Sequence, residues 1–472
     1  MEESYKKNEV PLNQPAISLN RVLGVFTAVL LVSGNMIGTG IFKKVVPMAQ
    51  TGMSHNFILL AWLVAGLIVL FGAFTFAGLA KLTTESGGNY EYLRVSFGNF
   101  ISFLNGWGLF IIIGSGSVAA IAFIFAQSVN SLIAIPNPFQ QWNHHSIAHS
   151  IYPFDSSGIK IFSVITVMVL TWFNYRGVRN SAFLNNILTS AKILGILFLI
   201  LAGLILATPP STVEVISTPS IIHHTPSLSI FMAAMLSAFW AYDGFTNVTA
   251  IAGEIKNPKR NIPIAIITAV SLVMILYVLI NYAFMKAMPL EQLAALDKNK
   301  IAATEIAGKL LGNGGSMLIS ILIMLSSFGT LNIILLFYSR VYFRMSQEGV
   351  FFKGAAKIHP FYRTPYNALL YSMIWSCILI ISGTFDVLTN MVIFTGFAFY
   401  MLTAIGLIIL KKRKKITDKI PGYPLAPILF IVFIAIFLTG ILISNPRQSL
   451  AGTALLFTGV PFYYFFRRNK RI

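Results

Sequence analysis

Long apolar runs separated by short polar segments dominate the pattern of this chain. A helix that crosses a bilayer needs about 20 apolar residues at 1.5 Å rise per residue. Twelve runs approach that length, so the sequence predicts an all-α polytopic membrane protein with twelve transmembrane helices. The predicted spans are residues 22–46, 57–80, 99–133, 161–177, 183–207, 228–253, 262–285, 315–343, 366–382, 385–410, 424–443 and 451–466.

The chain is expected to form one membrane domain over residues 18–467, between two short tails at 1–17 and 468–472. The first tail is polar and is predicted to be disordered. Within the connector 286–314, apolar residues recur at helical spacing among charges, which predicts short amphipathic helices on the outer surface. These helices act either as a lid over the transport path or as a connector without a gating role.

Composition and charge agree with a membrane location. The chain is 56% hydrophobic and 10% charged, and its net charge is +19. With the N-terminus placed inside, 25 of the 34 Lys and Arg residues fall on inner segments. This asymmetry predicts a multi-pass protein of the cell inner (plasma) membrane with both termini in the cytoplasm. The basic cluster 411–415 is interpreted as a topology anchor that also contacts anionic lipids, and not as a nucleic-acid site.

Two spans are interrupted by polar and glycine-rich stretches. The first carries "SGNMIGTG" at 33–40, and the sixth carries "AYDGFTN" at 241–247. Five spans separate them, so the second copy would be inverted relative to the first. Broken helices at matching positions of inverted halves indicate a transporter binding site. The expected fold is a 5+5 inverted repeat, with repeats at about 20–207 and 228–410 and two further helices at about 424–466.

The two breaks expose backbone groups of opposite partial charge to a ligand. A helix that starts at a break exposes unpaired N–H groups, and a helix that ends there exposes unpaired carbonyls. The amides of Thr39, Gly40 and Ile41 are therefore expected to hold a carboxylate. Carbonyls near Met36, Ile37, Trp240 and Ala241 are expected to hold an ammonium group. An α-amino acid carries both groups on one carbon, whereas packing of glycines against a neighbouring helix is the structural alternative.

Asp243 and Lys192 are the two charged residues that the spans place deep in the membrane. A charge at the bilayer centre costs about 2.5–3.5 kcal/mol on insertion scales, so each must face protein or a cavity. A functional role is favoured over a packing role for both residues, more strongly for Asp243, which lies beside Gly244 in the sixth-span break.

Several motifs resemble those of a known family. "GNMIGTGIF" (34–42) resembles the first-span motif of the amino acid–polyamine–organocation superfamily. "FWAYDGFTNVTAIAGEIKNPKRNIPIAI" (239–266) is similar to the sixth span and following loop of its L-type amino acid transporter branch, bacterial type. Further matches are "ESGGNYEYL" (85–93), "GSVAAIAFIFA" (116–126), "SRVYFRMSQEGVF" (339–351) and "IHPFYRTP" (358–365).

The resemblance implies a central substrate site between the first and sixth spans. It assigns the carboxylate to Thr39 and Gly40, with Gly38 shaping the turn. It assigns the ammonium group to carbonyls of Ile37, Trp240 and Ala241. The remaining implied roles are the following: Trp240 is an aromatic gate, Tyr242, Asp243 and Gly244 border the substrate, and Lys192 is a tethered cation that replaces sodium and bridges the two broken helices.

Two departures from the family pattern affect the expectations. Many members carry Trp where this chain has Phe245, so the pocket is expected to be roomier at that second gating position. The outer loop after the third span lacks cysteine, and Cys377 is the one cysteine of the chain. No disulfide-linked heavy subunit is therefore expected, and the protein is predicted to be a monomer or weak homo-oligomer. No cofactor and no metal are expected, since the histidines lie mostly in outer loops without acidic partners.

The predicted function is sodium-independent transport of small neutral L-amino acids such as Ala, Ser or Thr, by exchange or import through alternating access. Three alternatives stay open: a cationic amino acid transporter with Asp243 as the specificity residue, a proton-coupled symporter, and a sensor that binds without transport. An enzyme is not expected, because the spans lack a histidine and carry a single acid deep within them.

Overall fold

The computed structural model describes residues 19–142, 154–207, 227–296, 301–382, 385–444 and 446–468. The two predicted tails, apart from residue 468, lie outside this part of the chain. The first half contains α1 (Val25–Met36), α2 (Gly40–Lys43), α3 (Val45–Ala49), α4 (His55–Leu79), α5 (Asn89–Phe97), α6 (Asn99–Gly108), α7 (Gly114–Asn130), α8 (Ser157–Tyr175) and α9 (Val178–Leu206). The second half contains α11 (Leu228–Tyr242), α12 (Pro258–Ala287), α13 (Leu290–Ala295), α14 (Ala302–Gln347), α15 (Tyr366–Ser382), α16 (Phe385–Lys412), α17 (Leu425–Ser444), α18 (Pro446–Phe457) and α19 (Gly459–Arg468).

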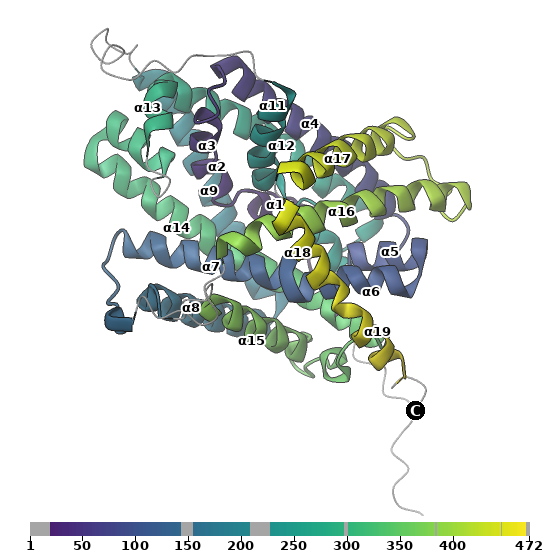
Figure 1. The fold of residues 1–472 in the computed structure, drawn as a ribbon. Coiled ribbons are helices and arrows are strands. Elements are labelled where there is room, and N and C mark those ends of the chain that lie inside the picture. Colours follow the sequence, from purple (N-terminus) through teal and green to yellow (C-terminus); the bar gives the residue numbers. More distant parts are fainter. Residues whose placement is uncertain are drawn as a thin grey trace, which may run out of the picture.

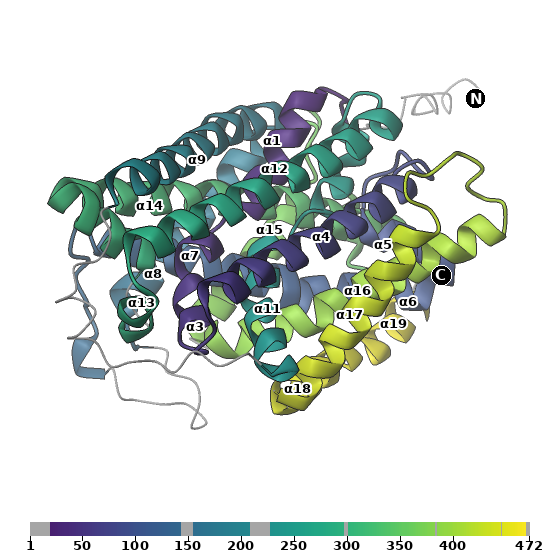
Figure 2. The same ribbon diagram turned by 90° about the horizontal axis from the view of Figure 1, so that it is seen from above.

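The helices form one bundle in which the broken first helix lies near the centre (Figure 1). In both views α3 and α13 lie at one end of the bundle and α5 at the other (Figure 2). The helices α17, α18 and α19 lie together on one flank (Figure 1). Because α1 packs against α9, α12 and α14, its break is enclosed by protein and not by lipid.

Each predicted span coincides with helical structure to within a few residues. Among the described residues, ten helical segments are long and apolar enough to cross a membrane. The other two predicted spans correspond to α11 with 15 residues and α15 with 17 residues, which are shorter. The helical architecture is confirmed, whereas the count of twelve crossings and the inverted repeat stay predictions.

The connector predicted to hold short outer helices does contain them. The first is α13, and the second is the start of α14, which is set off from the remainder by a kink at Gly312, where φ is 67°. The Gln50 side chain after α3 donates to the Ala294 carbonyl at 3.2 Å, so α13 is held beside α3. The role of α13 as a lid stays a prediction.

Two short helical segments complete the element order. A π-helical turn, η1 (Leu109–Ile113), joins α6 to α7, and a 3-10 helix, η3 (Asn247–Glu254), follows α11.

A buried ion pair lies at the α5 end of the bundle. Glu254 and Arg340 in α14 are both fully buried and form two parallel hydrogen bonds, of 3.0 and 2.9 Å. The Glu254 carbonyl also accepts from the Leu23 N–H at 3.0 Å, so this residue joins the start of the first helix to α14.

Candidate substrate site at two broken helices

The first helix is broken at residues 37–39. The α-helix ends at Met36, and Ile37 has a non-helical ψ of 78°. The Gly38 N–H turns back to the Met36 carbonyl at 2.8 Å, and helix resumes at Gly40. The interruption predicted at 33–40 is therefore shorter in the structure, because residues 33–36 still belong to α1. Since α2 starts at Gly40, the N–H groups of its first residues have no partner within the helix.

The second break follows Tyr242, where α11 ends. Asp243 is extended, with ψ of 157°, and Gly244 has φ of +92°. This backbone conformation favours glycine, and a Cβ at Gly244 would lie 2.2 Å from the Asn35 amide nitrogen. The chain then continues as the 3-10 helix η3 and not as an α-helix. Both predicted discontinuities are present in the structure.

Two side chains fasten the breaks to each other. The Asn35 Nδ2 atom donates to the Gly244 carbonyl at 2.8 Å. The hydroxyl of Tyr277 in α12 lies 2.7 Å from the Met36 carbonyl and 3.1 Å from the Ala241 carbonyl. Because these carbonyls end α1 and α11, the hydroxyl supplies a donor that the helices themselves lack. The two breaks therefore form one rigid junction.

Lys192 extends from α9 into the first break and is fully buried. Its ammonium group donates to the Gly34 carbonyl at 2.9 Å, the Ile37 carbonyl at 3.0 Å and the Thr330 hydroxyl at 2.8 Å. Hydrogen bonds from a charged donor are stronger than neutral ones. The family resemblance predicts that this cation bridges the two broken helices. Its hydrogen bonds instead join the first broken helix to α14.

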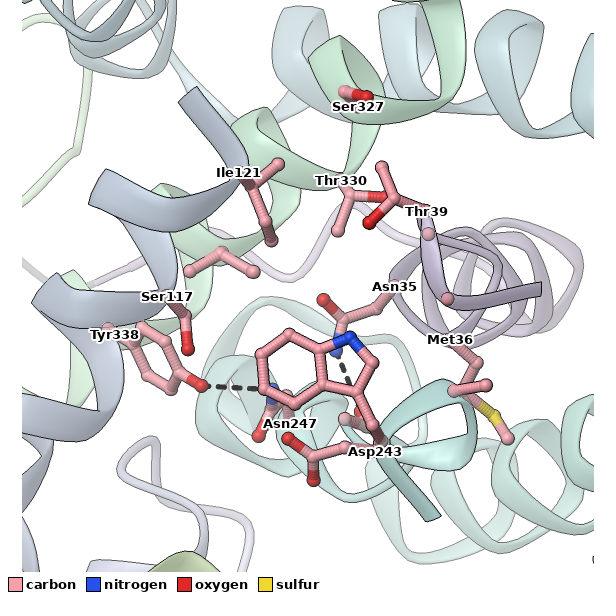
Figure 3. Close-up of a pocket in the computed structure, with 16 residues that line it drawn as sticks. Asn35, Met36, Thr39, Ser117, Ile121, Asp243, Asn247, Ser327, Thr330 and Tyr338 are labelled. Atoms are coloured by element: carbon pink, nitrogen blue, oxygen red, sulfur yellow. Dashed lines mark hydrogen bonds between the residues drawn. The ribbon is translucent and has the colours of Figure 1, made fainter. Parts of the chain in front are cut away.

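A polar cavity lies between the two breaks (Figure 3). Its volume of about 60 Å³ is enough for about four water molecules. Seven of the predicted site residues line it: Gly38, Thr39, Gly40, Trp240, Ala241, Asp243 and Gly244. Ile37, Ile41, Tyr242 and Phe245 are fully buried and are not among its lining residues.

The buried carbonyl of Ile37 already has donors. Besides Lys192, the hydroxyl of Ser326 in α14 lies 3.0 Å from this oxygen. The Tyr242 hydroxyl points elsewhere and donates to the Trp62 carbonyl in α4 at 3.2 Å. These contacts assign Ile37 and Tyr242 to the support of the breaks and not to the wall of the cavity.

Asp243 lines the cavity and accepts a hydrogen bond from the hydroxyl of Tyr400 in α16 at 3.0 Å. The sequence left two roles open for this carboxylate, either recognition of a basic substrate or a hydrogen bond within the protein. Protein partners are present: the Tyr400 hydroxyl, which was not expected, and the backbone of Gly244, as expected, whereas the Tyr242 hydroxyl is directed elsewhere. The negative charge of the Asp243 carboxylate is thus partly stabilised by hydrogen bonding within the protein before any ligand binds.

The two predicted gating residues differ in position. Trp240 is a lining residue of the cavity, and the ammonium group of Lys44 lies 5.6 Å from the centre of its ring. Phe245 packs edge-on against Phe76, with ring centres 5.7 Å apart, and also against Tyr400 at 5.7 Å. Phe245 is therefore part of the aromatic packing behind the site.

Six polar lining residues were not singled out by the sequence analysis. They come from α1, α7, η3 and α14 (Figure 3). They are Asn35, Ser117, Asn247, Ser327, Thr330 and Tyr338. A signal was present for some, because "LSSFGT" (325–330) gathers hydroxyl side chains within an apolar span. A lone tyrosine such as Tyr277 or Tyr338 in a long apolar helix gives no comparable signal.

A cavity between two broken helices of a polytopic bundle is typical of a secondary transporter. A family model for amino acid permeases matches residues 23–466, so the chain belongs to the amino acid permease family. Within the amino acid–polyamine–organocation superfamily, it is similar to the L-type branch. The resemblance seen in the sequence motifs is thereby confirmed.

The curated relatives are similar over nearly the whole chain. The serine/threonine exchanger SteT of Bacillus subtilis is 28% identical over 457 residues, which cover 96% of this chain and 98% of the exchanger. The human large neutral amino acids transporter small subunit 2 is 30% identical over 98% of this chain and 83% of its own length. The human Asc-type amino acid transporter 1 is 29% identical over 98% of this chain and 85% of its own length.

Replacement of Tyr277 by Phe is expected to weaken the junction between the breaks. The change keeps the ring against Trp62 but leaves the Met36 and Ala241 carbonyls without this donor. Loss of a buried donor costs about 1–3 kcal/mol, so we expect amino acid uptake to fall about tenfold. Tyr282→Phe on the same helix is the control, since that side chain is exposed. Equal uptake by Tyr277→Phe and wild type would show that the hydroxyl does not matter.

Proposed function

We propose that the protein is a sodium-independent transporter that exchanges small neutral L-amino acids such as Ala, Ser and Thr by alternating access. The observation that carries the proposal is the Lys192 ammonium group, which lies in the first break beside a small polar cavity. A tethered cation at this position supplies the charge that a bound sodium ion would otherwise bring to the break carbonyls.

The substrate is proposed to bind by its two charged ends. Its carboxylate meets the N–H groups of Thr39, Gly40 and Ile41 at the start of α2, where the turn at Gly38 leaves room for it. Its ammonium group meets carbonyls at the end of α11, contributed by Trp240 and Ala241. A carbonyl oxygen has two lone pairs, so the Ala241 oxygen can accept from both Tyr277 and the substrate.

Three observations support a small neutral substrate. The cavity is small, its lining includes one carboxylate, and that carboxylate already accepts from Tyr400. The names of two relatives agree with a neutral substrate, since one is a large neutral amino acids transporter and the other a serine/threonine exchanger, and the second name also agrees with a small one. Trp240 is proposed to close over the substrate, with Phe245 fixing the second gating position from behind.

The transport cycle is proposed to follow the 5+5 inverted repeat, with both termini cytoplasmic in the plasma membrane. Exchange is favoured over proton-coupled symport and over a non-transporting sensor because SteT is an exchanger. No disulfide-linked subunit is proposed, since Cys377 is buried in α15. Counterflow in proteoliposomes with and without a pH gradient separates exchange from proton coupling, and binding without flux would indicate a sensor.

Competition of labelled alanine uptake by the full set of amino acids tests the substrate proposal. We expect Ser, Thr and Ala to compete at least about tenfold more strongly than Arg, since the cavity is small and the Asp243 carboxylate already accepts a hydrogen bond from Tyr400. Asp243→Asn should keep this order, with Asn247→Asp as a matched variant that adds a carboxylate to the cavity and should admit Arg. Strong inhibition by Arg in wild type that disappears in Asp243→Asn would favour a cationic amino acid transporter.

A further inference from the structure

A second cavity adjoins the substrate site on the side of α5 and α6. Its volume is about 30 Å³, enough for about two water molecules. It is bordered by α6, η1, α14 and α16, by the residues at the start of α5, and by η3, which follows the second break. The polar lining residues are Asn89, Asn105, Thr246, Asn247, Thr249, Tyr338 and Tyr400. Its lining contains no charged side chain among the described residues.

A single pair of side chains separates the two cavities. Asn247 and Tyr338 line both of them. The Asn247 Nδ2 atom donates to the Tyr338 hydroxyl at 3.4 Å, visible as a dashed line in Figure 3. This distance is beyond the usual range of 2.7–3.2 Å for such a bond. This hydrogen bond is therefore weak, and its loss when either side chain moves to connect the cavities costs little.

Two amide oxygens in the second cavity lack a hydrogen-bond donor. The Oδ1 atoms of Asn89 and Asn105 are buried and have no partner. Asn105 is 2% exposed, so bulk water does not compensate its oxygen. A buried acceptor without a donor is unfavourable, and a ligand with several N–H donors satisfies it. An ammonium group has three donors and no acceptor, which fits two amide oxygens.

We propose that this second cavity is a transit site, in which Asn89 and Asn105 bind the ammonium group of the amino acid as it passes between the central site and the α5 end of the bundle. The proposal rests on the proposed transport function. The cavity accommodates the ammonium end, and the rest of the substrate occupies the gap that opens between Asn247 and Tyr338. In the predicted topology this end faces the cytoplasm.

Gly396 in α16 allows the transit site to be filled without disturbing its neighbours. This residue lines the second cavity, and a Cβ added to it would meet no atom within 4 Å. Gly396→Leu is therefore expected to occupy the cavity. Gly440→Leu in α17 is the matched control, since a Cβ at Gly440 has its nearest contact at 3.9 Å and lies outside both cavities.

The experiment compares equilibrium binding with exchange in proteoliposomes for alanine and threonine. Gly396→Leu should leave the Kd of the central site within about twofold and slow exchange at least about tenfold, with threonine slowed more than alanine because added bulk in a packed site excludes the larger substrate first. Asn105→Ala should slow both substrates by a similar factor of about five to ten, since both share the ammonium group. Gly440→Leu should exchange like wild type.

Different failures have different meanings. If wild type neither binds nor exchanges amino acids, the proposed function fails and the transit site fails with it. If wild type exchanges normally and Gly396→Leu does the same, the second cavity holds water only and the transit proposal is wrong. A loss that is equal for both substrates and accompanied by a changed Kd would assign Gly396 a structural role and also overturn the proposal.

Discussion

Lys192→Ala is expected to reduce sodium-free amino acid exchange at least about 100-fold, since a hydrogen bond from a charged group contributes about 1.5–3 kcal/mol and this ammonium group makes three. The change leaves the Gly34 carbonyl with the Thr330 hydroxyl as its one remaining side-chain donor among the described residues. It also removes the contacts of α9 with the first break, whereas the hydroxyls of Ser326 and Thr330 still join α14 to the break carbonyls. Counterflow of labelled substrate in sodium-free proteoliposomes measures the effect.

Lys286→Ala provides a matched control for this prediction. Lys286 also donates to a backbone carbonyl, that of Leu204 at 2.7 Å, but its side chain is exposed at the end of α12. Its replacement should change exchange by less than about twofold, because water replaces an exposed hydrogen bond. Partial recovery of Lys192→Ala on addition of sodium would support the interpretation of Lys192 as a tethered cation. Undiminished sodium-free exchange by Lys192→Ala would refute it.

Glu254→Ala should lower the free energy of unfolding by about 3–5 kcal/mol, because it leaves the Arg340 guanidinium buried without a counter-charge. Both side chains are fully buried, so solvent screens neither charge. The main-chain carbonyl at residue 254, which accepts from the N–H groups of Val22 and Leu23, is retained in this variant, so the loss arises from the side chain. Unfolding by a denaturing detergent in mixed micelles measures the change.

Two further variants test whether the loss of stability comes from the broken ion pair or from any substitution in this region. Glu254→Leu combined with Arg340→Met should recover most of the lost stability, since replacing both partners of a buried pair is often neutral. Glu85→Ala should cost less than about 1 kcal/mol, because Glu85 is 59% exposed and lies 3.9 Å from Arg344. If Glu85→Ala and Glu254→Ala lower the free energy of unfolding equally, burial of the Glu254–Arg340 pair does not explain its contribution to stability.

The broken helices were predictable because their cause is local. Gly34, Gly38 and Gly40 weaken the first span wherever the helix forms, and an Asp-Gly pair does the same in the sixth. The exact limits were less predictable. Residues 33–36 stay helical because α1 packs closely there, with a Cβ at Gly34 reaching within 2.1 Å of the Thr189 hydroxyl. Gly34 therefore allows α1 to pack closely against α9, in addition to weakening the helix near the break.

The partners of the charged residues could not be predicted. A functional role was predicted for Lys192, but its contact with Thr330 joins residues 138 positions apart in the chain. A functional role was predicted for Asp243 too, whereas its partner Tyr400 is 157 positions away. The pair of Glu254 and Arg340 was missed as a buried ion pair because each residue lies near the end of a predicted span, where a charge ordinarily reaches water.

The sequence alone determined the membrane class, the helical spans, the two breaks and the family, because these depend on apolar run length, local helix propensity and contiguous motifs. The tertiary structure decided which groups meet at the breaks. It placed Lys192 and Tyr277 on the break carbonyls, paired Asp243 with Tyr400, and joined a second cavity to the first across Asn247 and Tyr338. These contacts arise from the packing of distant helices, which no local pattern in the chain encodes.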